Sequence, residues 1–180
     1  MNLLADAQER DTHSVVRDVL GYIRRCQRDD GGILWFEDGK LDPWDHTEAA
    51  MALTIGGNFQ GFQRAFEWLR ANQNTDGSWF AMYYGPSDTP EKERAKIETN
   101  FVAYPACGLW HYYLVTQDRD FVTATFPMVA HAIDFVLAQQ NPEGDVQWAL
   151  SRQEDLPNDA LITACASILR SLECAIALAE

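Results

Sequence analysis

Apolar residues recur along the chain at the spacing of amphipathic helices. Val16, Val19 and Ile23, for example, stand at i, i+3 and i+7, so they would line one face of a helix. Pro127 interrupts one such pattern and marks a point where a helix restarts or kinks. Helices with one apolar face and one solvent-exposed face are therefore predicted for 14–27, 58–72 and 118–140.

Three other segments are apolar on nearly every side, which is typical of buried helices. They are 46–56, 99–116 and 159–179, and Pro105 stands early enough in the second to occupy a first turn or a kink. No alternation of useful length predicts strands. Half-exposed and buried segments thus alternate, which predicts six helices in three antiparallel hairpins.

The connections also alternate in length. Gly56–Gly57 and a turn near Gln117 are short links, whereas 29–48, 76–98 and 143–159 are long. Because short links join antiparallel neighbours, all three long loops should emerge at one end of the bundle. Function is expected at that end, with 85–97 as a mobile flap or insertion.

Each long loop opens with the same residue types. Gln27, Gln73 and Gln140 each precede a glycine by four residues, and a tryptophan follows: QRDDGGILW, QNTDGSW and QNPEGDVQW. Glycine permits the left-handed turn that ends a helix, glutamine can bond freed backbone groups, and tryptophan can pack the loop onto the helices. One interpretation of the repeat is therefore purely structural.

The repeat also resembles known families. Gln-x-x-x-Gly-x-Trp, strict in 73–79 and stretched by two residues in the other copies, is similar to the QW repeat of terpenoid cyclases and protein prenyltransferases. The stretches EWLRANQNTDGSW, ETNFVAYPACGLWHYYLVTQDRDFV and FPMVAHAIDFVLAQQ look like hairpins of six-hairpin glycosidases of the glucoamylase type. Both resemblances imply an α/α toroid, an all-α ring of antiparallel hairpins with its site at one mouth, but they imply different ligands.

Residues 1–180 are expected to form one such domain, with about three hairpins where the families close a ring with five or six. The last predicted helix ends on apolar residues at 178–179, without a glycine cap. An open edge of this kind would expose a hydrophobic patch. We therefore expect a partner to complete the ring, either in a homo-oligomer or as the remainder of a longer chain.

Acidic residues cluster where the second predicted helix begins, in DPWDHTE. Asp45 and Glu48 have the spacing of a capping box, which is the structural interpretation. The chemical interpretation makes Asp42, Asp45 or Glu48 an acid that protonates an alkene, or one of a carboxylate pair that cleaves a glycosidic bond, with Glu98 as the candidate partner of Asp45. Glu98 also precedes Thr99, a good helix cap. The chain has neither the D-x-D-D motif of alkene-protonating cyclases nor the D-x-C of prenyltransferase zinc sites.

Aromatic residues are concentrated in the long loops. Their faces stabilise cations and offer flat platforms to sugar rings or isoprenyl chains, although some are expected simply to pack the loops onto the helices. His111 would line the ring lumen or be a hydrogen-bonded core residue. The candidate ligand-binding residues are Trp35, Trp44, His46, Trp79, Tyr83, Tyr84, Asn100, Tyr104, His111 and Trp148.

Charge and composition exclude several classes. The net charge of −13 argues against nucleic acid and anionic membrane surfaces, and no apolar stretch approaches the roughly 20 residues of a membrane span. The first residues carry no hydrophobic signal segment, and the four cysteines form no C-x-x-C pair, so a cytoplasmic protein with reduced thiols is expected. No metal site or cofactor is predicted.

The three long loops hold seventeen acidic and five basic residues, which is nearly all of the net charge. An acidic, aromatic mouth disfavours a bare diphosphate and suits a neutral or cationic ligand. The main hypothesis is a protein like terpenoid cyclases and prenyltransferases that binds or converts a neutral isoprenoid-like ligand. The alternatives are a carbohydrate-active domain of the six-hairpin glycosidase type, using a carboxylate pair, and a non-catalytic helical scaffold subunit.

Overall fold

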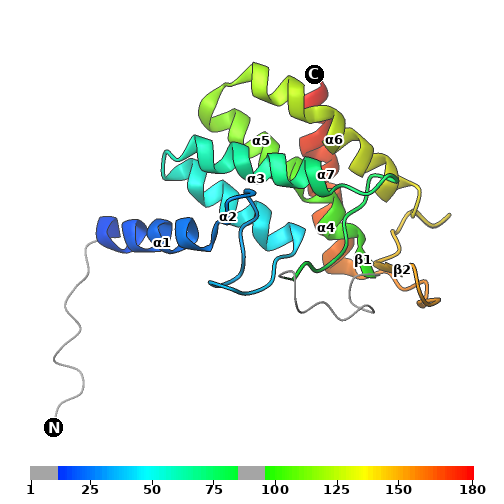
Figure 1. Cartoon of the computed structure of the whole chain (residues 1–180). Helices are drawn as coiled ribbons and strands as arrows, with labels where there is room; N and C mark the ends of the chain where they lie inside the picture. The colour runs from blue at the N-terminus through cyan, green and yellow to red at the C-terminus, as the bar shows by residue number, and fades with distance from the viewer. Residues whose placement is uncertain (1–11, 85–95) are drawn as a thin grey trace, which may run out of the picture.

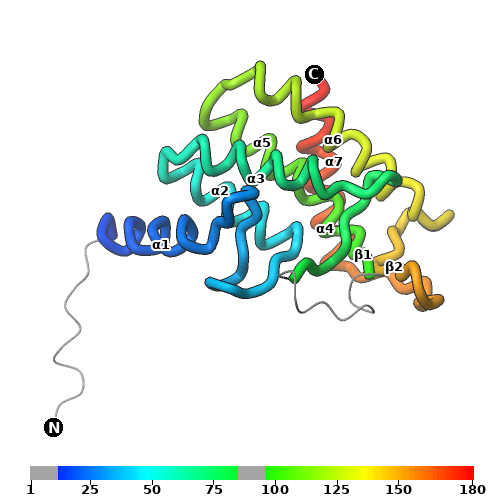
Figure 2. The backbone as a smooth tube through the Cα atoms, viewed as in Figure 1, coloured from blue at the N-terminus to red at the C-terminus, as the bar shows by residue number. Residues whose placement is uncertain are grey.

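The computed structural model describes residues 12–84 and 96–180. Within them the chain forms helices and one small antiparallel sheet (Figures 1 and 2). The predicted flap lies largely in 85–95, outside the described residues. The elements are α1 (Thr12–Cys26), α2 (Pro43–Ile55), α3 (Phe59–Asn72), β1 (Lys96–Glu98), α4 (Thr99–Ala103), α5 (Pro105–Thr116), α6 (Arg119–Leu137), β2 (Ala149–Ser151) and α7 (Ile162–Ala179).

The helices are arranged as three hairpins in two layers. The inner layer contains α2, α4 with α5, and α7, each packed on the next; the outer layer contains α1, α3 and α6. The α1 end and the α7 end are the two edges of this partial ring (Figure 1). The described parts of the three long loops lie towards the lower and right-hand side of that view, at one end of the bundle, as the alternating connection lengths predict. The predicted all-α partial ring of three hairpins is therefore confirmed.

The start of α2 differs from the prediction. Asp42 is its N-cap, with the side-chain Oδ1 accepting the backbone N–H of Asp45 at 2.8 Å, and Pro43 occupies the first helical position. The predicted capping box of Asp45 and Glu48 is wrong, because the helix begins three residues earlier than its apolar pattern and Glu48 instead accepts the indole N–H of Trp44 at 3.0 Å.

Two further differences lie around the second and third loops. The fourth predicted helix is divided into α4 and α5 next to Pro105, which has no N–H with which to continue the ladder. β1 and β2 were not predicted because three residues each are too few to show alternation; Ile97 faces Leu150 in their register. Thr99 caps no helix end with its side chain, since its hydroxyl donates to the carbonyl oxygens of Gln147 and Trp148.

The repeated glutamines and glycines form the same turn in all three loops. Gln27, Gln73 and Gln140 donate from Nε2 to the carbonyl of the glycine four residues on, at 3.1, 3.0 and 2.9 Å. These glycines have φ angles of 97°, 91° and 98°, which favour glycine. The structural interpretation of the glutamine and glycine is confirmed.

The last helix, α7, is less covered than predicted. Its residues Ile162, Leu169 and Ile176 are 90%, 60% and 61% exposed, because no element of the described chain packs on that side. By length and composition α6 and α7 would each suffice for a membrane span, but core helices meet the same measure. Both bury one face against other helices of the bundle.

Candidate functional site

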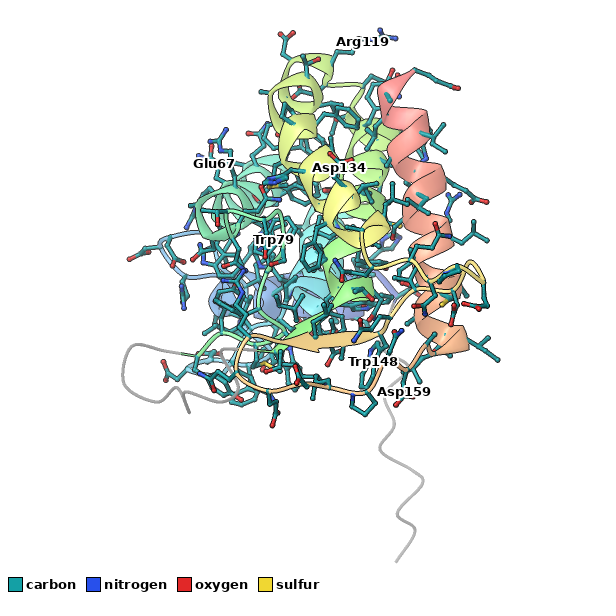
Figure 3. All side chains as sticks on the ribbon, turned by 90° about the vertical axis from the view of Figure 1, so that its right-hand side faces the viewer. Glu67, Trp79, Arg119, Asp134, Trp148 and Asp159 are labelled. Carbon is teal, nitrogen blue, oxygen red and sulfur yellow. The ribbon has the colours of Figure 1, made fainter. Side chains whose placement is uncertain are left out.

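A cleft of about 700 Å³ opens at the loop end of the ring. Its walls come from the first long loop, the first turn of α2, the second long loop, β1, the start of α4 and the third long loop. Figure 3 shows Trp148 and Asp159 at this end of the molecule and Arg119 at the opposite end. The lining residues are Trp35, Lys40, Asp42, Trp44, Asp45, Ala81, Met82, Tyr84, Lys96, Glu98, Asn100, Phe101, Glu154 and Leu156.

About half of the residues singled out from the sequence line this cleft. The structure brings together three of the four candidate acids and four of the ten candidate ligand-binding residues: Asp42, Asp45, Glu98, Trp35, Trp44, Tyr84 and Asn100. The others lie behind the wall or elsewhere in the bundle: Glu48, His46, Trp79, Tyr83, Tyr104, His111 and Trp148.

Asp42 is the most perturbed acid of the site. It is only 1% exposed, and its carboxylate accepts hydrogen bonds from the Trp35 indole N–H and the Asp45 backbone N–H. Burial raises the pKa of Asp42 to about 7, and the charge of Asp45 adds to the increase; the two N–H donors offset only part of it. Asp42 therefore holds its proton up to neutral pH, as a general acid must.

The other carboxylates of the cleft have different surroundings. Asp45 is exposed on the rim, next to Asp42. Glu98 forms an ion pair with Lys96, with Nζ and Oε1 2.8 Å apart. Glu154 is exposed on the third loop, so the cleft contains carboxylates on more than one wall. A buried acid with a raised pKa and further carboxylates in one cleft are the groups that glycoside cleavage requires.

Aromatic rings form a platform beside these acids. The ring of Trp44 stacks on that of Tyr104, with centroids 3.8 Å apart and an interplanar angle of 8°, and Phe101 lies 6.1 Å from Trp44. Glu48 links the two rings, because one of its oxygens accepts both the Trp44 indole N–H at 3.0 Å and the Tyr104 hydroxyl at 3.1 Å. The predicted acid Glu48 is thus a positioning group for the platform.

His46 does not line the cleft as the sequence interpretation expected. It is fully buried, with Nδ1 accepting the Ile33 N–H at 3.0 Å and Nε2 donating to the Ala65 carbonyl at 2.9 Å. Burial lowers the pKa of His46 to about 4, so the ring is neutral. It ties the first loop to α3.

The remaining candidates also have structural surroundings. Trp79 is fully buried and donates to the Leu69 carbonyl at 2.8 Å, so it seals its loop as the repeat predicts (Figure 3). Tyr83 packs edge-on against Trp68, and Trp148 lies under the Lys96 ammonium, which is 4.5 Å from the ring centroid. Half-buried His111 belongs to α5, away from the cleft; its Nδ1 has no partner within the described residues.

The sequence interpretation missed several lining residues. Lys40, Lys96 and Glu154 carry charge into the cleft, and Met82 and Leu156 add apolar surface. Their only signal in the sequence was their position in the long loops. Over 12–84 and 96–180, no group of three or more His, Cys, Asp or Glu side chains could hold a metal ion.

Helical hairpins around part of a ring, with a cleft at the loop mouth, define the α/α-toroid class, and no family model matches the chain. Solved structures share this fold. Cellobiose 2-epimerase from Bacillus thermoamylovorans gives a TM-score of 0.67 at 12% identity over 92% of this chain and 51% of that chain. The endo-β-1,4-glucanase CMCax of Acetobacter xylinum gives 0.64 at 14% identity over 88% and 52%.

Sequence similarity to one curated protein is much higher. The MMP endo-(1,4)-3-O-methyl-α-D-mannosidase of Mycolicibacterium hassiacum is 42% identical over 178 residues, which is 99% of this chain and 46% of the relative. The chain therefore spans less than half the length of this relative and about half of the solved structures named above.

These similarities correct the main hypothesis drawn from the sequence. The relative is a glycosidase, and the similar solved structures are carbohydrate enzymes, so the interpretation as a terpenoid cyclase or prenyltransferase is wrong. That interpretation relied on the QW-like repeat. The repeat forms a turn between outer and inner helices of a toroid, and it does not determine which ligand is bound. The resemblance to six-hairpin glycosidases fits the structure.

Proposed function

We propose that the cleft binds an α-(1,4)-linked oligosaccharide of mannose or 3-O-methylmannose, and that Asp42 is the acid of a glycosidase site. The observation that carries this proposal is a buried Asp42 in the lining of an aromatic cleft, where burial raises the pKa of its carboxyl to about 7. The identity of 42% to a mannosidase supports the substrate class. Because the chain spans less than half of that relative, binding and cleavage are tested separately.

In the proposed reaction, the Asp42 carboxyl gives its proton to the glycosidic oxygen as the C1–O bond breaks. A water molecule adds to C1, and its proton passes to a carboxylate acting as base. Glu98, which lines the cleft from β1 and is ion-paired with Lys96, is the candidate for this second role. Asp45 acts through Asp42, because its negative charge helps to keep the neighbouring acid protonated.

Three residues of the cleft lining are proposed to bind the sugar. Trp44 and Trp35 offer ring faces to sugars, and Trp35 is 41% exposed. Asn100 lines the cleft, and its buried Oδ1 accepts no hydrogen bond from the described residues, so it offers an unused acceptor to a sugar hydroxyl that reaches it.

The test uses a defined 3-O-methyl-α-1,4-mannooligosaccharide, with a cello-oligosaccharide of equal length as comparison. Calorimetry should detect binding of the mannoside to the wild-type chain, and chromatography should detect its cleavage. Asp42→Asn should retain binding and lower the cleavage rate by about a hundredfold or more. Asp38→Asn is the matched control, because Asp38 is exposed in the same loop, outside the cleft, with a φ of 61° that Asn tolerates.

The outcomes separate the alternatives. Cleavage that survives Asp42→Asn would exclude Asp42 as the acid. Mannoside binding without cleavage by the wild-type chain would support a binding module. Failure of the folded chain to bind the mannoside contradicts the proposed substrate.

A further inference from the structure

The first two loops connect successive outer helices of the ring through the same pair of contacts, a glutamine hydrogen bond and a close glycine approach, which we call a lock. Besides its own glycine, Gln27 Nε2 donates to the Gly61 carbonyl in α3 at 2.8 Å, and Gln73 Nε2 donates to the Met128 carbonyl in α6 at 2.9 Å. Each acceptor stands twelve residues before the loop glutamine that follows its own helix. The first and second loops therefore bond to equivalent points on the outer helix that follows each of them.

The loop glycine completes the lock. A Cβ added to Gly31 would lie 2.1 Å from the Arg64 carbonyl oxygen, and one added to Gly77 would lie 2.3 Å from the His131 carbonyl oxygen. Arg64 lies three residues after Gly61, and His131 lies three residues after Met128, so each stands about one helical turn beyond the carbonyl that accepts the glutamine hydrogen bond. The first and second loops thus pack against two successive turns of the next outer helix, and neither has room for a side chain at its glycine.

The third loop forms the same turn, but no outer helix of the described residues packs against it. Gly144 N–H donates to the Asn141 carbonyl at 2.9 Å and Asn141 N–H to the Asp145 carbonyl at 2.8 Å, matching the bonds of the second loop. Gln140 Nε2 bonds the Gly144 carbonyl and no second acceptor in the described residues. A Cβ on Gly144 would meet nothing within 4 Å.

The edge of the ring that carries this third turn also exposes apolar side chains. Leu137, at the end of α6, is 45% exposed, and α7 exposes Leu169 and Ile176 along the same edge of the ring. In the first two hairpins the corresponding edges are covered by the following inner and outer helices. The unfilled turn and the uncovered apolar face therefore belong to one edge.

We propose that Gln140 and Gly144 form a docking socket for the outer helix of a fourth hairpin, whose inner helix covers α7. The solved toroids and the mannosidase are about twice as long as this chain, which leaves room for three further hairpins. The inference rests on the repeat geometry and is independent of the proposed glycosidase activity.

Charge favours a hairpin of different sequence over a second copy of this chain. In a ring of two copies, α1 would enter the socket, and the equivalent carbonyls would be those of Val15 and Asp18. Asp18 would then face a loop that carries Glu143 and Asp145. In the first lock this position holds Arg64, whose guanidinium donates to the Arg28 carbonyl at 2.8 Å. A helix with a basic or neutral residue there fits the socket.

The test co-produces this chain with the part of the Mycolicibacterium hassiacum mannosidase that the similarity leaves uncovered. Size-exclusion chromatography with light scattering should show a one-to-one complex, and biolayer interferometry should measure its Kd. Gln140→Ala should weaken binding about fivefold, and Gly144→Ala more than about tenfold. Gln117→Ala is the control, because the Gln117 side chain donates to the Tyr113 and Leu114 carbonyls of its own helix, at the opposite end of the ring.

Three results would overturn the proposal. The first is no complex with the wild-type chain while circular dichroism shows it folded. The second is a complex that Gly144→Ala leaves unchanged. The third is a dimer of this chain alone that Gln140→Ala dissociates, because the occupant would then be a second copy. Loss of mannoside cleavage alone, with the complex intact, would count only against the proposed function.

Discussion

Trp35 donates its indole N–H to the Asp42 carboxylate, so an exposed ring of the cleft and its buried acid form one unit. This bond stabilises the charged form of Asp42, so it offsets part of the effect of burial, which raises the pKa of Asp42 to about 7. Trp35→Phe keeps a ring but removes the donor, so the pKa of Asp42 should rise further. Carboxyl-carbon NMR titration would measure it, with Trp44→Phe as the comparison. A pKa that falls or stays unchanged would contradict this account.

Asp42 and His46 should give the folded chain opposite dependences on pH. The raised pKa of Asp42 means that its contribution to stability is full below the unfolded pKa near 3.8 and is lost as pH rises towards 7. The lowered pKa of His46 means that its contribution is full above the unfolded pKa near 6.5 and is lost as pH falls towards 4. Between pH 4 and 6.5 the two effects oppose each other, each of order 3 kcal/mol.

Single variants separate these two effects. Compared with wild type, Asp42→Asn should make the free energy of unfolding rise more steeply with pH, because the His46 contribution is no longer opposed. His46→Gln should make it fall with pH over the same range. Urea unfolding at pH 4.5, 5.5 and 6.5 measures both slopes. Parallel curves for wild type and both variants would show that neither group titrates as described.

Gly77 and Gly144 have nearly the same φ and very different surroundings, so their alanine variants should differ in stability. Gly77→Ala places a Cβ 2.3 Å from the His131 carbonyl oxygen, whereas Gly144→Ala meets open space. Gly144→Ala should cost about 1 kcal/mol through its backbone alone, and Gly77→Ala clearly more. Thermal unfolding of the chain alone compares them. Equal losses would mean that the second lock contributes little to the fold.

The sequence predicted the repeated features better than the single ones. Gln27, Gln73 and Gln140 recur with their glycines, so three copies identified one turn, while the alternation of half-exposed and buried segments predicted the hairpins. Asp42 was one of three candidate acids in its segment, but its burial could not be predicted, because it depends on how the first loop folds and brings the Trp35 indole to the carboxylate. His46 was misassigned for the same reason: its partners, Ile33 and Ala65, are 13 and 19 residues away in sequence.

Trp44 should contribute more to sugar binding than its exposure alone suggests, because Tyr104 and Glu48 fix its ring before any ligand arrives. A held ring loses little freedom on binding, so Trp44→Ala should weaken mannoside binding about tenfold. Tyr104→Phe, which removes only the hydroxyl bond to Glu48, should have a smaller effect. Calorimetry measures both. Phe36→Ala is the control, since Phe36 is 52% exposed in the first loop but lies outside the cleft lining. If Phe36→Ala weakens binding as much as Trp44→Ala, the sugar lies outside the cleft and the platform has another role.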